Sequence, residues 1–136
     1  MNICVIPARG GSKRIPRKNI RIFHGKPIIE YAISCALESD LFEHVVVSTD
    51  DQDIANVARE CGAEIPFMRA DSLADDHTPT VPVVADAIIK CEAHGWSIEN
   101  VCCIYPCVPF LRPKDLHDAL RLLNEKNVDY LFPIVE

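Results

Sequence analysis

Short apolar runs and longer amphipathic segments alternate along this chain, and the alternation limits its fold more than any other feature. Apolar runs of strand length occupy residues 2–8, 44–48, 64–68, 100–105 and 130–135. An uninterrupted apolar run is typical of a strand covered on both faces, as in a parallel sheet between layers of helices. We therefore predict five strands, with residues 2–8 forming the central one.

Between these runs, apolar residues recur every three or four positions, which predicts four helices packed on the sheet. We expect Pro27 to open the first helix, Asp50 or Asp51 to cap the second, Thr80 to cap the third and Pro113 to open the fourth. The residues expected on the inner helix faces are Ile28, Ile29, Ala32, Ile33, Ala36, Leu37, Ile54, Val57, Ala58, Cys61, Val81, Val84, Ala87, Ile88, Cys91, Leu116, Ala119, Leu120 and Leu123. The fold class is thus α/β, a three-layer, doubly wound and mostly parallel sheet with right-handed crossovers.

Length and cysteine content suggest one intracellular domain. A chain of 136 residues is sufficient for one hydrophobic core, so residues 1–136 are taken as one domain. Six of the seven cysteines (Cys4, Cys35, Cys61, Cys91, Cys102 and Cys103) lie in apolar segments without C-x-x-C spacing, which favours buried, reduced thiols and a cytoplasmic location. The sequence begins directly on a strand, and its apolar runs are shorter than a membrane helix requires, so we expect neither a signal peptide nor membrane association.

The loop after the first strand concentrates positive charge in an acidic chain. Residues 9–21 contain six of the 14 Lys and Arg residues and no acid, while the whole chain has a formal charge of −6. Gly10 and Gly11 allow the backbone N–H groups to approach an anion, and Arg9, Lys13 and Lys18 supply the countercharge. Because the loop leaves the carboxyl end of a parallel strand, where ligands of α/β proteins usually bind, we predict a polyphosphate site. The alternative is a solvated basic turn.

Other nucleotide-binding and nucleic-acid-binding classes match the sequence less well. The spacing of Gly10, Gly11, Ser12 and Lys13 is not that of a P-loop, and the G-x-G-x-x-G pattern of an NAD-binding domain is missing. The acidic balance, and a basic loop without aromatic residues, argue against nucleic acid as a partner. A noncatalytic nucleotide-binding module remains open.

The motifs of this chain resemble those of the CMP-sialic acid synthetase (acylneuraminate cytidylyltransferase) family, whose members activate nine-carbon acidic sugars (nonulosonic acids). The matching segments are Ile6-Pro7-Ala8-Arg9-Gly10-Gly11-Ser12-Lys13, Ile15-Pro16-Arg17-Lys18-Asn19, Val47-Ser48-Thr49-Asp50-Asp51, and the block around Arg69, Leu73 and Asp76. Further segments, Pro66-Phe67-Met68-Arg69, Cys102-Cys103-Ile104-Tyr105 and Pro109-Phe110-Leu111, look most like the pseudaminic acid branch.

The resemblance implies a sheet like that of the nucleotide-diphospho-sugar transferases and transfer of CMP from CTP to a nonulosonic acid, with release of pyrophosphate. It implies catalytic roles for Arg9, Lys13 and Lys18 at the phosphates. The substrate-binding residues that it implies are Ala8, Gly10, Gly11 and Ser12 at the triphosphate, Asn19, Arg69 and Thr80 at the cytidine, and Tyr105 beside them. Without the resemblance, Asn19 could be a turn residue, Arg69 a surface cation and Thr80 only a helix cap.

The sequence departs from the sialic acid enzymes in one motif. Those enzymes usually carry Gln-Pro-Thr-Ser-Pro-Leu after the fourth strand, whereas this chain has Tyr105-Pro106-Cys107-Val108-Pro109-Phe110. The change favours pseudaminic acid as the acceptor, with N-acetylneuraminate and legionaminic acid as alternatives. Cys107 has no histidine nearby in the sequence and is expected to be inert.

The resemblance covers only the front portion of a family member. The Mg²⁺-binding aspartates, much of the sugar pocket and the dimerisation arm of the family would follow this portion, so Mg²⁺ and a homodimer are expectations for the full-length protein. This portion alone could bind CTP without turning it over. Within this chain we assign no metal ligand, because Asp50-Asp51 and Asp75-Asp76 match caps and loop carboxylates and the five histidines lack zinc spacing.

Overall fold

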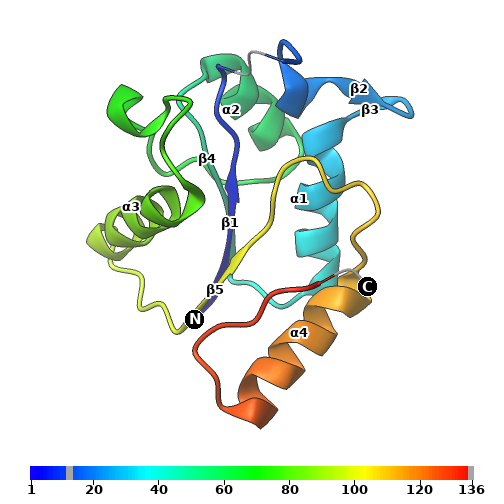
Figure 1. Ribbon diagram of the computed structural model, residues 1–136, viewed down its shortest axis with the longest axis vertical. Helices are drawn as coiled ribbons and strands as arrows, with labels where there is room; N and C mark the ends of the chain where they lie inside the picture. Colours follow the sequence, from blue (N-terminus) through cyan, green and yellow to red (C-terminus); the bar gives the residue numbers. More distant parts are fainter. Residues whose placement is uncertain (12–13, 135–136) are drawn as a thin grey trace.

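A three-stranded parallel sheet lies at the centre of the computed structural model, which describes residues 1–11 and 14–134. The strand order is β4 (His44–Ser48), β1 (Asn2–Pro7), β5 (Asn100–Cys103). In the register, Cys4 lies beside Val45 on one side and Cys102 on the other. The prediction that residues 2–8 form the central strand is confirmed (Figure 1).

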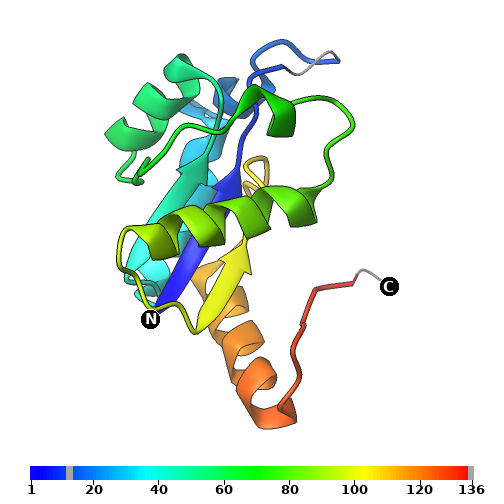
Figure 2. The same ribbon diagram turned by 90° about the vertical axis from the view of Figure 1, so that its left-hand side faces the viewer.

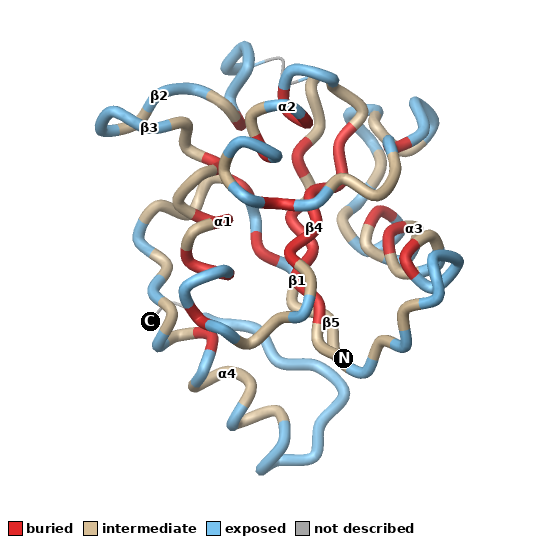
Figure 3. The backbone as a smooth tube through the Cα atoms, turned by 180° about the vertical axis from the view of Figure 1, so that it is seen from behind, coloured by how far each residue is buried: buried red, intermediate tan, exposed pale blue. Residues whose placement is uncertain are grey.

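Side chains alternate across β1 and divide the interior into two cores. Cys4 and Ile6 face a large core, whereas Ile3 and Val5 face a smaller one, and all four are fully buried. Because successive strand residues point to opposite faces, an uninterrupted apolar strand requires a cover on both sides. Figure 3 shows this buried centre as a continuous stretch along β1 and β4.

Four helices provide that cover and confirm the α/β class. Helices α1 (Ile28–Ser39), α2 (Gln52–Glu60) and α4 (Pro113–Lys126) contribute to the large core, and α3 (Thr80–Ala93) packs on the opposite face. Figure 2 shows α3 lying across the sheet. No described helix has the length and apolar character needed to cross a membrane.

The basic loop continues into a short hairpin before the first long helix. A 3₁₀ turn at Lys18–Ile20 is followed by strands β2 (Ile22–Phe23) and β3 (Lys26–Pro27), which pair antiparallel. Pro27 is therefore the residue before α1 and not its first residue, whereas Pro113 does open α4 as predicted. A second 3₁₀ turn occupies Asp71–Leu73.

Two of the five predicted strands are wrong. In residues 64–68, only Glu64 pairs, in an isolated bridge to Val46, and Pro66 then offers no N–H to continue the ladder. Residues 130–134 are exposed and form no strand within the described residues, and Pro133 again offers no backbone N–H for a ladder. The predicted end of this strand, Val135, lies outside the described residues. Strand β5 also ends at Cys103 and does not reach Tyr105.

Several details of the helix faces also differ from prediction. Pro79, and not Thr80, is the N-cap of α3. In the first turn of this helix Val83 is buried, whereas Val81, which was expected on the inner face, is exposed. Leu37 is 45% exposed near the end of α1. Cys103 is exposed on β5, at the edge of the described sheet, so the prediction that it is buried is wrong.

Candidate functional site

The carboxyl ends of β1 and β5 open into a cleft of about 430 Å³. Parallel strands bring their carboxyl ends to one edge of the sheet, which is why loops distant in sequence meet there. The cleft is lined by Pro7, Arg9, Lys18, Asn19, Arg69, Thr78, Thr80, Val83, Tyr105, Pro106, Cys107 and Val108. Six residues predicted from sequence thus meet in one cavity: Arg9, Lys18, Asn19, Arg69, Thr80 and Tyr105.

Two of the predicted cations, Arg9 and Lys18, line the cleft, and they differ in whether a carboxylate pairs with them. The Arg9 guanidinium forms an ion pair with Asp76, which comes from the segment between the second 3₁₀ turn and α3. Among the described residues, no carboxylate is within ion-pairing distance of Lys18. Lys18 therefore offers a positive charge to an incoming anion. Ser12 and Lys13 lie outside the described residues.

Asn19 is a buried link between two walls of the cleft. Only 4% of its surface is exposed, its Nδ2 donates to the Arg9 carbonyl at 2.9 Å, and its Oδ1 accepts a weak bond from the Cys107 thiol at 3.6 Å. Burial raises the pKa of the Cys107 thiol, although Lys18 opposes the shift, so the thiol stays protonated at neutral pH. Asn19 is more than an exposed turn residue, and Cys107 contacts it as a neutral donor.

The glycine turn is hydrogen-bonded to an aspartate outside the basic loop. The Gly10 N–H donates to Asp50 Oδ1 at 2.9 Å, so this amide is not directed at the cleft, contrary to the role expected for it. A Cβ on Gly10 would lie 2.7 Å from Asp51 Cβ, whereas one on Gly11 would meet no described atom within 4 Å. Ala8 is fully buried, and its N–H donates to the Ser48 carbonyl.

Arg69 is a buried cation and not the surface residue that its sequence context alone allows. Its Nη2 donates to the Ser48 carbonyl at 2.7 Å and its Nε to Ser48 Oγ at 3.1 Å, and only 6% of the residue is exposed. Burial lowers the pKa of the guanidinium, and the nearby carboxylates of Asp50 and Asp86 oppose that shift. Arg69 therefore stabilises the end of β4 while reaching the cleft wall.

Thr80 and Tyr105 close the opposite side of the cleft. The two hydroxyl groups lie 3.2 Å apart and join the first turn of α3 to the loop after β5. As the first residue of its helix, Thr80 directs its hydroxyl into this contact instead of capping the helix, which corrects the sequence-based expectation. Tyr105 is 57% exposed at the mouth of the cleft, where it can contact a bound molecule.

Asp51 is the cap of α2 and also holds the far end of the basic loop. Its Oδ1 accepts from the N–H groups of Asp53 and Ile54, and its Oδ2 accepts from Arg17 at 2.6 Å. Burial alone would raise the pKa of Asp51, but the bond from Ile54 and the Arg17 guanidinium lower it below its ordinary value. Between the two caps proposed from sequence, the structure selects Asp51 and gives Asp50 a different role.

Sequence reasoning missed the acidic partners of the loop. The contacts that Asp50 and Asp76 make with Gly10 and Arg9 span 40 and 67 residues of sequence, respectively. Contacts between residues so far apart in the sequence cannot be predicted from local periodicity. The only signal was their position in segments that carry the family resemblance.

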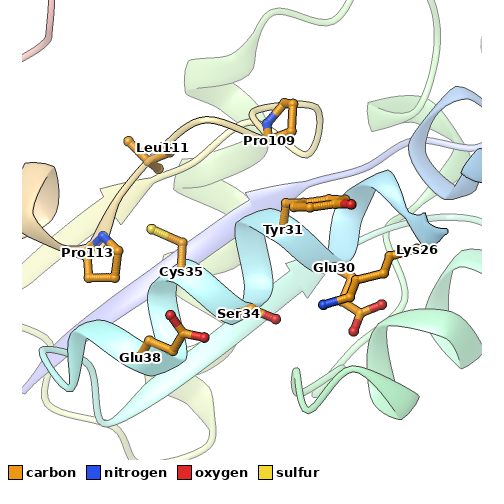
Figure 4. A pocket seen from close by; sticks show the side chains of 9 residues that line it. All are labelled: Lys26, Glu30, Tyr31, Ser34, Cys35, Glu38, Pro109, Leu111 and Pro113. Atoms are coloured by element: carbon orange, nitrogen blue, oxygen red, sulfur yellow. The ribbon is translucent and has the colours of Figure 1, made fainter. Parts of the chain in front are cut away.

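A second, smaller groove of about 190 Å³ lies between α1 and the loop before α4 (Figure 4). Tyr31 and Cys35 line it from the helix, and Pro109, Leu111 and Pro113 line it from the loop before α4. None of the predicted site residues belongs to it. Within residues 1–11 and 14–134, no group of three or more His, Cys, Asp or Glu side chains is placed to hold a metal ion.

Comparison with known proteins agrees with this geometry. Residues 3–135 match the family described as Cytidylyltransferase. A pseudaminic acid cytidylyltransferase from Campylobacter jejuni is 44% identical over 135 residues, which cover 99% of this chain and 58% of that protein. A CMP-N,N'-diacetyllegionaminic acid synthase from Legionella pneumophila is 38% identical, with 97% of this chain and 58% of that protein covered.

A solved structure extends the likeness to three dimensions. The CMP:2-keto-3-deoxy-manno-octonic acid synthetase, solved in complex with CTP, superposes with a TM-score of 0.77 at 25% identity, covering 93% of this chain and 48% of that one. The sheet, the basic loop and the matched family together define a nucleotidyltransferase fold. This chain belongs to the cytidylyltransferase family, and it spans somewhat more than half the length of the two curated relatives.

The two glycines of the basic loop provide a matched test of the turn geometry. We expect Gly10→Ala to weaken binding of inorganic triphosphate by about tenfold, because relief of the overlap with Asp51, an overpacking of about 1–3 kcal/mol, displaces the turn from its binding geometry. Gly11→Ala should weaken binding less than Gly10→Ala does, since its methyl group meets no described atom and the variant keeps the backbone amide. Isothermal titration of the three proteins measures the difference, and equal affinities for the two variants would contradict the described turn.

Proposed function

We propose that this chain is the nucleotide-binding portion of an enzyme that transfers CMP from CTP to a nonulosonic acid and releases pyrophosphate. The observation that carries the proposal is the cleft at the sheet edge, where Arg9 and Lys18 meet the buried amide of Asn19. Family membership supports cytidylyl transfer. The names of the relatives support pseudaminic acid as the first choice of acceptor, with legionaminic acid and N-acetylneuraminate as alternatives.

The reaction places negative charge where the basic loop can neutralise it. The anomeric oxygen of the sugar forms a bond to the α-phosphorus of CTP, in line with the bond to the departing pyrophosphate, which breaks, and the proton of the sugar hydroxyl passes to water. The departing pyrophosphate gains charge on its bridging oxygen, which fixed cations stabilise. In this proposal Arg9 and Lys13 hold the triphosphate with the amides of Gly11 and Ser12, and Lys18 acts near the reacting phosphate.

The opposite side of the cleft is proposed to receive the nucleoside and the acceptor. Asn19 and Thr80 border the space for cytidine, with Arg69 buried behind it. Tyr105 is at the cleft mouth. Because Arg69 already donates to Ser48, we assign it mainly to shaping the pocket wall.

The metal, the assembly and the cellular location of the whole protein stay proposals. Mg²⁺ is the metal that the family resemblance implies, and it would neutralise phosphate charge when bound. The described residues of this chain do not offer a set of ligands for it, so the roles above concern only the chain's own side chains. A homodimer and a cytoplasmic location are proposed on the same resemblance.

A second candidate function is CTP binding without turnover by this chain. The observation that favours it is coverage, since the chain matches only 58% of the length of the pseudaminic acid cytidylyltransferase. The cleft described above would serve binding in either case. Catalysis is therefore tested separately from affinity.

Nucleotide selectivity tests the proposal directly. A ligand at about 100 times its Kd stabilises a folded protein by about 2.7 kcal/mol, which raises the melting temperature of a chain of this size by several degrees. We expect such a rise with CTP and a smaller one with UTP or ATP. Absence of a rise with millimolar CTP would contradict nucleotide binding. Turnover is measured separately, as pyrophosphate release with CTP, pseudaminic acid and Mg²⁺.

The Arg9–Asp76 ion pair generates a second expectation. The triphosphate and the Asp76 carboxylate compete for one guanidinium, so Asp76→Asn should tighten CTP binding by up to about fivefold, given that exposed ion pairs are worth about 1 kcal/mol or less. Asp71→Asn is the matched control, because no contact between Asp71 and Arg9 is found within the described residues. Weaker CTP binding by Asp76→Asn would show that the two do not compete.

A further inference from the structure

The basic loop is attached to one short segment at two points. Near its start, the Gly10 N–H donates to Asp50 Oδ1 at 2.9 Å. Near its end, Arg17 donates to Asp51 Oδ2 at 2.6 Å, and its second terminal nitrogen is 3.0 Å from Asp53. Adjacent residues thus hold Gly10 and Arg17, which directly follow Arg9 and directly precede Lys18, the two described cations of the cleft.

The segment that provides these attachments is itself rigidly held. Ser48 and Thr49 are fully buried, and the Ala8 N–H donates to the Ser48 carbonyl at 2.9 Å. The Arg69 N–H donates to the Thr49 carbonyl at 2.7 Å, and Asp51 caps α2. Asp50 and Asp51 are therefore fixed to the sheet on one side and to a helix on the other.

The loop has little freedom to leave this segment. Any side chain on Gly10 would overlap Asp51, so the turn lies directly against it. Arg17 adopts a left-handed backbone conformation with φ 55°, which is unfavourable for a residue with a side chain. Its ion pairs with Asp51 and Asp53 help to stabilise that conformation.

We propose that Asp50 and Asp51 are positioning residues for the anion-binding loop, and this proposal rests on the CTP-binding function proposed above. Their charge alone would repel a triphosphate, so any benefit to binding must come from geometry. The two carboxylates fix the path of the loop and thereby aim Arg9 and Lys18 at the cleft. This role makes an acidic pair necessary for binding an anion.

Substitution of Asp50 separates geometry from charge, because two variants change the charge equally. Asp50→Ala removes both the charge and the acceptor for Gly10, whereas Asp50→Asn keeps an acceptor oxygen. We expect Asp50→Ala to weaken CTP binding by about tenfold, the range expected for loss of a bond to a charged group. Asp50→Asn should recover most of that loss, and Asp71→Asn should bind as the wild type does.

An electrostatic role predicts the opposite result. Removal of a carboxylate beside an anion site would tighten CTP binding, and it would do so equally in Asp50→Ala and Asp50→Asn. That outcome, measured by isothermal titration at one fixed salt concentration, would overturn the proposal. Equal weakening in both variants would overturn it as well, because the acceptor would then be irrelevant.

Hydrogen exchange of the Gly10 amide tests the attachment without any nucleotide. In the ligand-free wild type, we expect this amide to exchange at least about tenfold more slowly than an unstructured amide, because its bond to Asp50 must open first. Exchange should accelerate in Asp50→Ala and stay slow in Asp50→Asn. Unprotected exchange in the wild type would refute the attachment even if Asp50→Ala fails to fold.

The two measurements also distinguish which proposal fails. If Gly10 is protected through Asp50 but the wild type does not bind CTP, the proposed function is wrong and the attachment stands. If the wild type binds CTP and Asp50→Ala binds it equally well, the positioning role is wrong and the proposed function stands.

Discussion

Parallel pairing of β1 with β4 and β5 is the constraint on which the site depends. The ladder extends past the strands, since the Ala8 N–H donates to the Ser48 carbonyl and the Ile104 N–H to the Val5 carbonyl. The loops after three strands therefore start at one edge, within reach of one another. A slip of one residue in β1 would exchange its two buried faces and move the basic loop away from Asp50 and Asp51.

Carboxylates around the cleft have two distinct relations to its cations. Asp50 and Asp51 belong to a segment fixed by the sheet and α2, and they hold backbone and side-chain groups that define the loop. Asp76 belongs to a connecting segment and occupies the guanidinium of Arg9. Asp50 and Asp51 preorganise the loop, whereas Asp76 competes with a bound phosphate for the Arg9 guanidinium. We therefore expect the pair to favour anion binding and Asp76 to oppose it.

Sequence patterns predicted the parts of the fold that depend on local periodicity. Strand β1 and the four helices follow from apolar spacing and from glycine and proline positions, and the basic loop follows from its charge. Six residues named from that loop and from the family resemblance meet in the cleft. The strands expected at residues 64–68 and 130–135 failed because strand length and apolarity do not reveal whether a partner strand is present, and proline interrupts both. The role of Asp50 was missed because its bond to Gly10 depends on strand register.

In the proposed function, the cations after β1 bind the triphosphate of CTP. The most direct test of this binding is the CTP affinity of an Arg9→Gln, Lys13→Gln double variant, compared with the wild type by isothermal titration after circular dichroism shows that the fold is kept. Two charge-assisted contacts at about 1.5–3 kcal/mol each predict a loss of affinity of about a hundredfold or more. Wild-type affinity in the double variant would contradict the account.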